Sequence, residues 1–234
     1  MKKYLSLDIK KNILYNLGNL KYSFNTEINE YQSKTKKKIY FLMASTHFPD
    51  EVLHIESIKY LINKKIPVVI APRHIKRVGE IKKIFNKENL KTEFYSNFLK
   101  GNKHKYVKDG ILIIDTFGDL ESFYEEAKFV YVGGGFSKRG VQNILEPARF
   151  AKPIIIGPNI DNFYEEISGC REIVIIKAQA KFLIISNILE EIKFFIENPG
   201  IIEERGIKIK NQIKNFSGSL ENYLNFLIEK KVIS

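Results

Sequence analysis

The sequence predicts an α/β domain built on a Rossmann-like parallel sheet with helices on both faces, ending in C-terminal helices. Two observations lead to this fold class. Short apolar runs alternate with segments of helical periodicity between residues 39 and 177, and from residue 183 onward the periodicity is helical throughout. Strands that alternate with helices form a parallel sheet, and ligands of such sheets bind at the carboxyl ends of the strands.

Six apolar runs predict the main strands of this sheet. They cover residues 39–44, 66–71, 111–115, 129–133, 153–157 and 173–177, and a further short run lies at 92–96. Helical spacing predicts helices over 50–64, 75–89 and 119–127, and another that starts near Gln142. Asp50 and Glu51 open the first helix and Lys64 and Lys65 close it, which matches the charge preference of the helix dipole.

The last fifty residues contain only helical patterns. A helix from residue 183 ends before Pro199-Gly200, and two more helices cover 200–215 and 219–230. A chain of 234 residues is long enough for one well-buried α/β domain or two small ones. We expect a single domain over 1–234, with a lead-in segment over 1–20 and a C-terminal helical segment over 199–234.

Composition narrows the class of protein without choosing a function. Lysine and arginine exceed aspartate and glutamate by 11, an excess that attracts the phosphates of nucleic acid, anionic lipid or a nucleotide, and that solvated lysines explain equally well. The single cysteine, Cys170, excludes an intrachain disulfide and suits a reducing cytoplasm. The sequence has no signal-peptide core and no run of about 18 apolar residues that would span a membrane.

Polar residues follow the first two predicted strands. Ser45, Thr46 and His47 come after the first, where the hydroxyl groups either cap the next helix or contact a ligand. Pro72 and Arg73 end the second, where an arginine is well placed to hold a phosphate with two hydrogen bonds.

Glycine-rich sequence follows two later strands. Phe117, Gly118 and Asp119 lead into a helix whose free N–H groups either bind a ligand or are capped by neighbouring residues. Gly133 begins a run of three glycines that continues with Gly134 and Gly135, and such a run needs a reason because glycine is entropically costly to order.

A basic loop and a second capping pattern come after those glycines. Lys138 and Arg139 lie in the loop, and Asn143 with Glu146 three residues later fits a variant of the capping box. The capping pattern accounts for the asparagine and the glutamate without any ligand. It does not account for the three glycines or the basic residues.

These motifs, taken in order, resemble the 3-deoxy-D-manno-octulosonic acid (Kdo) transferases, which are two-domain glycosyltransferases of the GT-B fold. The resemblance runs from about residue 13 to 170. It rests on Gly18-Asn19-Leu20-Lys21, Ala44-Ser45-Thr46-His47, Pro72-Arg73-His74, Asp115-Thr116-Phe117-Gly118-Asp119-Leu120, Phe123-Tyr124, Gly133-Gly134-Gly135-Phe136, Asn143-Ile144-Leu145-Glu146-Pro147-Ala148, and Lys152-Pro153-Ile154-Ile155-Ile156-Gly157-Pro158-Asn159 with Asn162-Phe163. Each motif is modest, whereas the ordered set is specific.

The resemblance implies that the chain is the C-terminal, donor-binding domain of a GT-B enzyme that moves Kdo from CMP-Kdo to a lipid A precursor in lipopolysaccharide biosynthesis. The residues implied to bind CMP are Pro72, Arg73, Phe117, Gly118, Asp119, Asn143, Ile144, Leu145 and Glu146, with Arg73 on the phosphate and Glu146 accepting hydrogen bonds from the ribose hydroxyls. Further donor or acceptor contacts are implied for Ser45, Thr46, His47, Gly134 and Gly135.

The family resemblance also implies what the chain does not use. It implies no cofactor, no metal ion and no nucleic acid partner, and a cytoplasmic enzyme of a Gram-negative-type bacterium. Peripheral association with the anionic inner membrane is expected from the excess of basic residues alone. Gln142 stands where the family often has histidine, so a role that needs histidine there is in doubt. The family's N-terminal half, with the acceptor-binding face and the proposed base carboxylate, has no counterpart, so we expect no catalytic residue in this chain and little activity from it alone.

Three alternatives remain at this stage. One is another GT-B transferase or an epimerase that uses a UDP-sugar, which a preference for uridine over cytidine would reveal. Another is a basic nucleic-acid-binding module, which predicts steep salt dependence and loose nucleotide preference. The third is a degenerate subunit without activity, which the presence of Arg73 and Glu146 disfavours.

Overall fold

The structure, a computed structural model, describes residues 15, 39–99, 107–214 and 219–230. The chain divides into two compact units, one formed by Glu27–Ile213 and the other by Met1–Thr26 together with Lys214–Ser234. The expected single domain over 1–234 stays a prediction, since most of the smaller unit, including the lead-in segment and the Gly18-Asn19-Leu20-Lys21 motif, lies outside the described residues.

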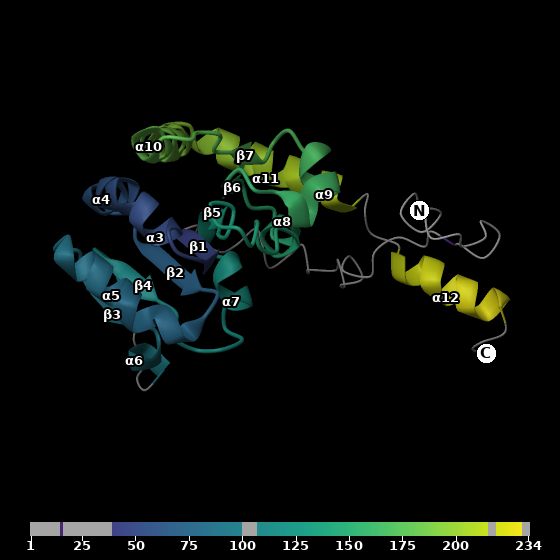
Figure 1. The fold of residues 1–234 in the computed structure, drawn as a ribbon, viewed down its shortest axis with the longest axis horizontal. Coiled ribbons are helices and arrows are strands. Elements are labelled where there is room, and N and C mark those ends of the chain that lie inside the picture. The colour runs from purple at the N-terminus through teal and green to yellow at the C-terminus, as the bar shows by residue number, and fades with distance from the viewer. Residues whose placement is uncertain (1–14, 16–38, 100–106, 215–218, 231–234) are drawn as a thin grey trace. The chain divides into compact units, whose positions relative to one another are not determined.

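The larger unit is built on one seven-stranded sheet in which every described strand pair is parallel, as predicted. The strands are β1 (Tyr40–Thr46), β2 (Val68–Pro72), β3 (Thr92–Phe94), β4 (Ile111–Ile113), β5 (Ala127–Val132), β6 (Ile154–Ile156) and β7 (Val174–Ile175). Their order across the sheet is β3-β4-β2-β1-β5-β6-β7 (Figure 1). The chain therefore places β2, β3 and β4 on one side of β1, with β4 between β2 and β3, and then returns to β1 to place β5, β6 and β7 on the other side.

Helices cover one face of the sheet. Phe41 and Met43 of β1 and Phe129 of β5 point into this core with alternate residues of β2 and β4. The covering helices are α3 (Asp50–Leu53), α4 (Ile55–Asn63), α5 (Val78–Lys87) and α10 (Lys181–Glu197). Strand residues of period two and helix residues of period 3.6 thus meet in one apolar layer.

Strand residues that alternate with those of the first core point to the other face of the sheet, where they are also buried. Tyr40 of β1 lies against α7 (Glu121–Tyr124), where its hydroxyl group donates to the Phe123 carbonyl oxygen at 2.7 Å. Val130 and Val132 of β5 are also buried, as are residues of α8 (Leu145–Arg149) and α9 (Tyr164–Ser168). Helices on both faces confirm the predicted doubly covered sheet.

The helix predicted over 75–89 is observed as a 3-10 turn over Ile75–Arg77 followed by α5, and three other predicted helices are divided or shorter than expected. The helix over 50–64 is divided at His54, where the backbone N–H and the ring nitrogen Nδ1 of His54 both contact the Asp50 carbonyl oxygen, at 3.2 and 2.8 Å. The helix over 119–127 shrinks to α7, since the buried Lys152 ammonium group donates to the carbonyl oxygens of Glu125 and Ala127.

The third is the helix expected from Gln142, which begins instead at Leu145 as the five-residue α8. Upstream, the Val141 and Gln142 N–H groups donate to the carbonyl oxygens of Asn159 and Gly133. Those two residues are thus held in the loop rather than in the helix.

The C-terminal helices match their predictions closely. Helix α10 is followed by α11 (Pro199–Lys214) and, in the smaller unit, by α12 (Ser219–Glu229). Within that unit the ring of Tyr15 lies 4.5 Å from the ring of Phe226, and the Lys230 ammonium group lies over both rings. None of the described helices is long and apolar enough to cross a membrane.

The only cysteine of the sequence sits between α9 and β7. Cys170 is buried, and burial raises the pKa of its thiol. Its backbone N–H donates to the Ile167 carbonyl oxygen at the end of α9.

Candidate functional site

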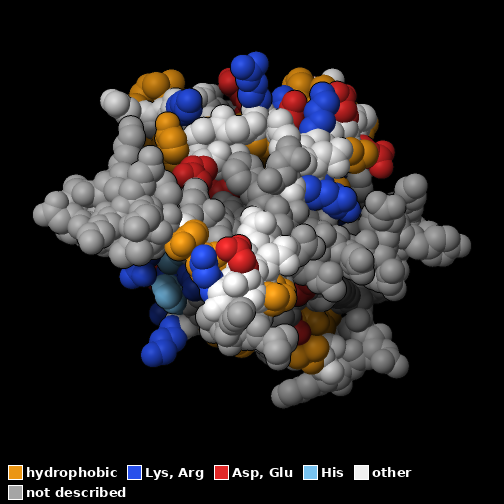
Figure 2. All heavy atoms as spheres, turned by 90° about the vertical axis from the view of Figure 1, so that its right-hand side faces the viewer, with side chains coloured by type: hydrophobic (Ala, Val, Ile, Leu, Met, Phe, Trp, Pro, Cys, Tyr) orange, Lys and Arg blue, Asp and Glu red, His pale blue; other side chains and the backbone are white. Residues whose placement is uncertain are grey.

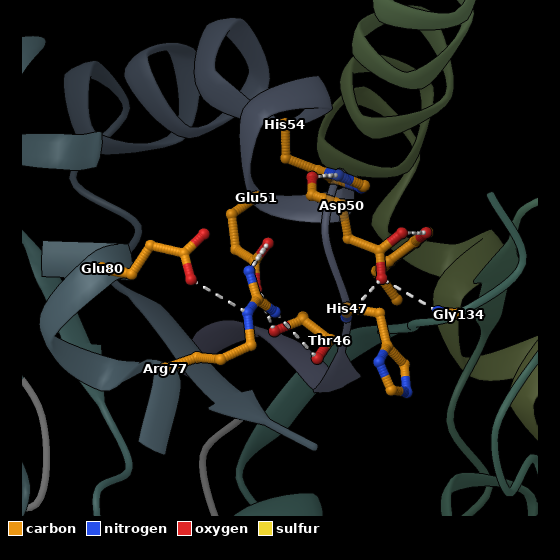
Figure 3. A network of polar contacts seen from close by, with 9 residues as sticks. Thr46, His47, Asp50, Glu51, His54, Arg77, Glu80 and Gly134 are labelled. Atoms are coloured by element: carbon orange, nitrogen blue, oxygen red, sulfur yellow. Dashed lines mark hydrogen bonds and ion pairs between the residues drawn. The ribbon is translucent and has the colours of Figure 1, made fainter. Parts of the chain in front are cut away.

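The order in which strands are added reverses between β1 and β5, and the predicted site residues Thr46, His47 and Gly134 lie at this point. β2 and β4 extend the sheet on one side of β1, while β5, β6 and β7 extend it on the other. In parallel sheets such a switch leaves a crevice outside the carboxyl ends of the strands, which is where ligands bind. Figure 3 shows the polar residues that gather there.

Asp50, at the start of α3, joins the two sides of the crevice. Its Oδ2 accepts hydrogen bonds from the backbone N–H groups of His47 at 2.8 Å and Gly134 at 2.9 Å, and its Oδ1 accepts one from the Tyr131 hydroxyl at 2.7 Å. Burial raises the pKa of Asp50 to about 6 even though these three donors oppose the rise. A single carboxylate thus fixes the loop after β1 to the turn after β5.

Glu51 forms a second buried network beside it. Both of its carboxylate oxygens accept from the Arg77 guanidinium group, at 2.9 and 3.1 Å, and the Thr46 hydroxyl donates to Oε1 at 2.7 Å. Arg77 also donates to Glu80 at 3.4 Å (Figure 3). Glu51 is fully buried, and its negative charge is compensated by this bidentate interaction with Arg77.

His54 lies behind these carboxylates, away from solvent. Its ring is 4.1 Å from the ring of Tyr131, and Nε2 is a buried nitrogen without a hydrogen-bond partner. Burial lowers the pKa of His54 to about 4, so the ring is neutral at pH 7. It therefore acts as a packed aromatic group rather than as a cation.

His47 is the predicted site residue that the structure places most distinctively. Only 7% of its surface is exposed, and its buried Nε2 has no hydrogen-bond partner among the residues that the structure describes. Its ring lies edge-on to the ring of His74, with 5.4 Å between centroids. Burial, with the nearby charges of His74, Arg139 and Arg77, lowers its pKa, which Glu51 opposes.

Arg73 follows β2 directly beside this histidine pair. The Arg73 backbone N–H donates to the Thr46 carbonyl oxygen at 3.1 Å, and Pro72 is the strand partner of Thr46. The Arg73 side chain is exposed and makes no ion pair with any residue in the described part of the chain. It is thus available to an anion, as its predicted role requires.

The glycine run has a structural explanation that the sequence did not suggest. A Cβ atom on Gly133 would lie 2.6 Å from the Ser45 carbonyl oxygen and from the Thr46 Cα, and one on Gly135 would lie 2.7 Å from the Gly157 backbone. Gly134 has a φ of +92°. The glycines therefore let the turn after β5 lie directly against the ends of β1 and β6.

Asn143 and Glu146 contact each other but do not form the expected capping box, since the N-cap of α8 is Ile144 and has no side-chain cap hydrogen bond. The Asn143 Oδ1 accepts from the Leu145 N–H at 3.0 Å, and its Nδ2 donates to the Glu146 Oε1 at 2.9 Å. The Tyr124 hydroxyl donates to Oε2 at 3.1 Å, and burial and Glu146 raise the pKa of Tyr124, which keeps that donor protonated. Glu146 is thereby held as an oriented acceptor.

The remaining predicted residues divide between exposed and buried positions. Phe117 is 94% exposed, and Gly118 has a φ of +90° that favours glycine. Ile144 and Leu145 are buried, so their side chains support the site from beneath. For residues 117–119 the described part of the chain has no hydrogen bond or ion pair to the other predicted site residues.

Asp50, Tyr131 and Arg77 are functional candidates that sequence reasoning missed. Asp50 was interpreted only as an acidic helix start, and no local pattern reveals that it contacts residues more than eighty positions away. The described residues contain no group of three His, Cys, Asp or Glu side chains that could hold a metal ion.

Comparison with known proteins gives consistent relatives. No protein-family model matches the chain. The 3-deoxy-D-manno-octulosonic acid transferase of Rickettsia bellii is 29% identical over 214 residues, covering 84% of this chain and 50% of the relative. That of Rickettsia prowazekii is 35% identical over 155 residues, covering 62% of this chain and 32% of the relative.

A solved structure supports the same relationship at the level of fold. The C-terminal CMP-Kdo binding domain of WaaA from Acinetobacter baumannii superposes with a TM-score of 0.59 at 22% identity, covering 82% of this chain and 98% of that domain. The predicted fold, the C-terminal half of a GT-B glycosyltransferase, is therefore confirmed. The chain spans about half the length or less of the curated relatives it matches, and it is related in sequence to the Kdo transferases.

Proposed function

We propose that this chain is the donor-binding domain of a Kdo transferase and that it binds CMP-Kdo at the carboxyl edge of β1, β2 and β5. The observation that carries this proposal is the placement of the exposed Arg73 beside His47 and His74 at the switch point of the sheet. The names of the relatives supply the donor's identity, and the ordered motifs support it.

The chemistry of the site suits release of a nucleotide. When the bond between Kdo and phosphate breaks, negative charge develops on CMP, and a preorganised cation stabilises it. Arg73 supplies that charge. Helices α7 and α8 have only four and five residues, so side chains carry more of this task than helix ends do.

Recognition of the ribose falls to Glu146. A carboxylate offers two acceptor oxygens to a diol, and the hydrogen bonds from Asn143 and Tyr124 fix the position of both oxygens. Phe117, Gly118 and Asp119 line the nucleotide pocket in this proposal, while Ser45, Thr46, Gly134 and Gly135 provide the edge nearest the sugar.

The complete enzyme needs more than this chain. In the proposal, a second domain corresponding to the other half of the relatives supplies the acceptor site and the base that activates the acceptor hydroxyl. The acceptor is a lipid A precursor, and the enzyme works at the cytoplasmic face of the inner membrane, where the net charge of +11 favours the anionic surface. The chain alone is expected to bind donor and to turn over little or none of it.

Calorimetric titration with CMP, UMP and UDP tests the proposal. Wild-type protein is expected to bind CMP in preference to the uridine nucleotides, and Arg73→Ala is expected to weaken CMP binding roughly tenfold, because a charge-assisted bond to phosphate contributes about 1.5 kcal/mol or more. The matched control is Arg171→Ala, which removes an exposed arginine just before β7, at the opposite edge of the sheet. That variant should bind CMP as wild type does.

Other outcomes would redirect the assignment. Tighter binding of UDP than of CMP would indicate a UDP-sugar transferase. Binding of single-stranded nucleic acid with steep salt dependence and no nucleotide preference would indicate a nucleic-acid module. Equal loss of CMP affinity in Arg73→Ala and Arg171→Ala would remove Arg73 from the phosphate site.

A further inference from the structure

The basic loop between β5 and α8 carries charge that the proposed phosphate and ribose contacts do not use. Lys138 and Arg139 lie in it, both exposed, and neither side chain makes an ion pair within the described ranges of the chain. Figure 2 shows a face of the molecule on which histidine side chains lie beside lysine and arginine side chains. Lys138 and Arg139 thus form a second group of cations, in addition to Arg73, that has no role in the proposed function.

The loop is rigidly held, which distinguishes it from an ordinary solvated charge. The Asn162 Nδ2 donates to the Arg139 carbonyl oxygen at 2.8 Å and to that of Val141 at 3.1 Å, and the Asn159 Nδ2 donates to the Ser137 carbonyl oxygen at 3.0 Å. The backbone on both sides of Arg139 is therefore fixed by two asparagine side chains from the segment after β6. Such support positions a side chain for binding.

The loop that carries Arg139 and the loop that carries His47 meet at Asp50, whose Oδ2 accepts hydrogen bonds from the N–H groups of both Gly134 and His47. The charge of Arg139 is among those that lower the pKa of His47, together with His74 and Arg77, and Glu51 is the one carboxylate that acts in the other direction. Glu51 is already engaged by Arg77 and Thr46. Asp50 is engaged in the same way by the Gly134 N–H and the Tyr131 hydroxyl, and neither carboxylate makes an ion pair with Arg139 in the described part of the chain.

His47 itself supplies independent evidence for a ligand. Its Nε2 is buried and lacks a partner, and an unpaired buried polar nitrogen carries a desolvation cost that native structures rarely leave unrelieved. In Figure 3 the His47 ring points away from the Asp50 carboxylate. An anion bound between His47, His74 and Arg139 would give that nitrogen an acceptor.

The strand order places the two arginines on opposite sides of this histidine. Arg73 follows β2 and Arg139 follows β5, with β1 and His47 between them. Neighbouring strands are about 4.8 Å apart, so the ends of β2 and β5 are roughly 10 Å apart across the edge. A ligand that lies across the end of β1 can therefore present one anionic group to the residues after β2 and another to those after β5.

A nucleotide-linked ulosonic acid has two such groups. The sugar carbon that is bonded to the phosphate oxygen also carries a carboxylate, so two negative charges lie next to each other on the donor. We propose that Arg139, with His47 and His74, binds the carboxylate of the donor sugar and thereby selects a sugar acid over a neutral sugar. This inference rests on the proposed function, since it assigns the second anion of the same donor.

Titration with two ligands separates the two charges. CMP carries only the phosphate, whereas CMP-Kdo carries both groups, so wild-type protein should bind CMP-Kdo more tightly. Arg139→Ala is expected to lower the affinity for CMP-Kdo about tenfold or more while changing the affinity for CMP less than about twofold. Arg139→Lys should recover part of the loss, because it restores charge without the two-bonded geometry.

Lys138→Ala is the matched control, since it removes an adjacent exposed cation of the same loop. It should leave the ratio of the two affinities unchanged, and thermal melting of each variant checks that the loop still folds. Equal effects of Arg139→Ala on both ligands, or no preference of the wild type for CMP-Kdo, would overturn this proposal while leaving donor binding intact. Failure of the wild type to bind either ligand would overturn the proposed function and this inference with it.

Discussion

At the scale of single residues, the turn after β5 depends on the absence of a side chain at Gly133. The three closest atoms to a Cβ there belong to Ser45, Thr46 and Asp50, at 2.6 to 2.7 Å, and two of them are backbone atoms that cannot move independently. The same turn receives the Asp50 hydrogen bond at Gly134. A substitution at this position therefore disturbs both sides of the crevice.

Gly133→Ala is predicted to destabilise the protein by about 2 kcal/mol or more, since overpacking against fixed backbone forces a shift in β1 or β5. Chemical denaturation measures the change. The control is Gly79→Ala in α5, where no atom lies within 4 Å of the new Cβ and alanine favours the helix by up to about 1 kcal/mol. Equal stability of the two variants would contradict the close approach.

His54 gives the unfolding free energy a dependence on pH. Its pKa is lowered to about 4 in the folded protein, against 6.5 for an unperturbed histidine, so its contribution is fully present above pH 6.5 and is lost as the pH falls towards 4. Between pH 7 and pH 5 this amounts to about 2 kcal/mol. Asp50 acts in the opposite direction, because a pKa raised to about 6 favours the folded state as the pH falls.

Comparison of wild type with His54→Gln isolates the histidine. The variant should lose less stability than wild type when the pH is lowered from 7 to 5, as measured by denaturation at each pH. Asp50 is present in both proteins, so its contribution cancels to first order. The same pH dependence in both proteins would show that His54 is not buried in its neutral form.

At the scale of elements, α10 closes the core on the face that also carries α3 and α4. Phe195 is fully buried on this helix, with its ring 5.2 Å from that of Phe129 in β5, while its neighbour Phe194 is partly exposed. The guanidinium group of Arg205 in α11 lies over both rings. The two phenylalanines therefore differ in burial but share one cationic neighbour.

Phe195→Ala is predicted to cost about 3–5 kcal/mol, as deletion of a buried aromatic ring does in packed cores. Phe194→Ala serves as the control and should cost far less, since its ring keeps contact with solvent. Thermal and urea denaturation of both variants measure the difference. Similar losses would mean that α10 does not pack through the face that contains Phe195.

The elements themselves were largely predictable from the sequence, and their ends were not. The strand predictions hold to within about two residues because each buried strand is a continuous apolar run, as in 153–157, where β6 covers Ile154–Ile156. The predicted bounds of α7 and α8 were wrong because Lys152 and Asn159 form hydrogen bonds with backbone groups remote in sequence. Lys152 donates to a carbonyl group, and the Asn159 carbonyl oxygen accepts from an N–H group. No local pattern encodes those bonds.

In the candidate site, too, the positions of residues were predictable from the sequence and their long-range contacts were not. The positions of Arg73 and Glu146 after their strands follow from the rule that parallel strands end at one edge. The Asp50 network and the unpaired nitrogen of His47 depend on which strands become neighbours, and that order was visible only in the folded chain. The capping box expected from Asn143 and Glu146 does not form, because Ile144 is the N-cap of α8 and the two side chains bond to each other instead.

At the scale of the whole molecule, the net charge of +11 opposes compactness through self-repulsion. Salt screens that repulsion, since the Debye length falls from about 10 Å at 0.1 M to about 3 Å at 1 M. The buried pair of Glu51 and Arg77 is screened much less than the exposed lysines. Added salt should therefore stabilise the protein.

The melting temperature is predicted to rise when sodium chloride is increased from about 0.05 M to 0.5 M, by an amount that differs little with sodium acetate, because screening depends on ionic strength. Phosphate at equal ionic strength should raise it further if the cations near His47 bind anions. A melting temperature that falls with salt would mean that surface ion pairs outweigh the net repulsion.

Because Cys170 is buried, its reaction with a thiol reagent can be used to measure local opening of the structure. A thiol reagent reacts with the thiolate, which burial suppresses in the closed state, so modification proceeds only when the segment between α9 and β7 separates from the sheet. Since the sequence has no other cysteine, the labelling rate measures that one event. Slower labelling with a bound nucleotide would mean that the ligand at the crevice also restrains the far edge of the sheet.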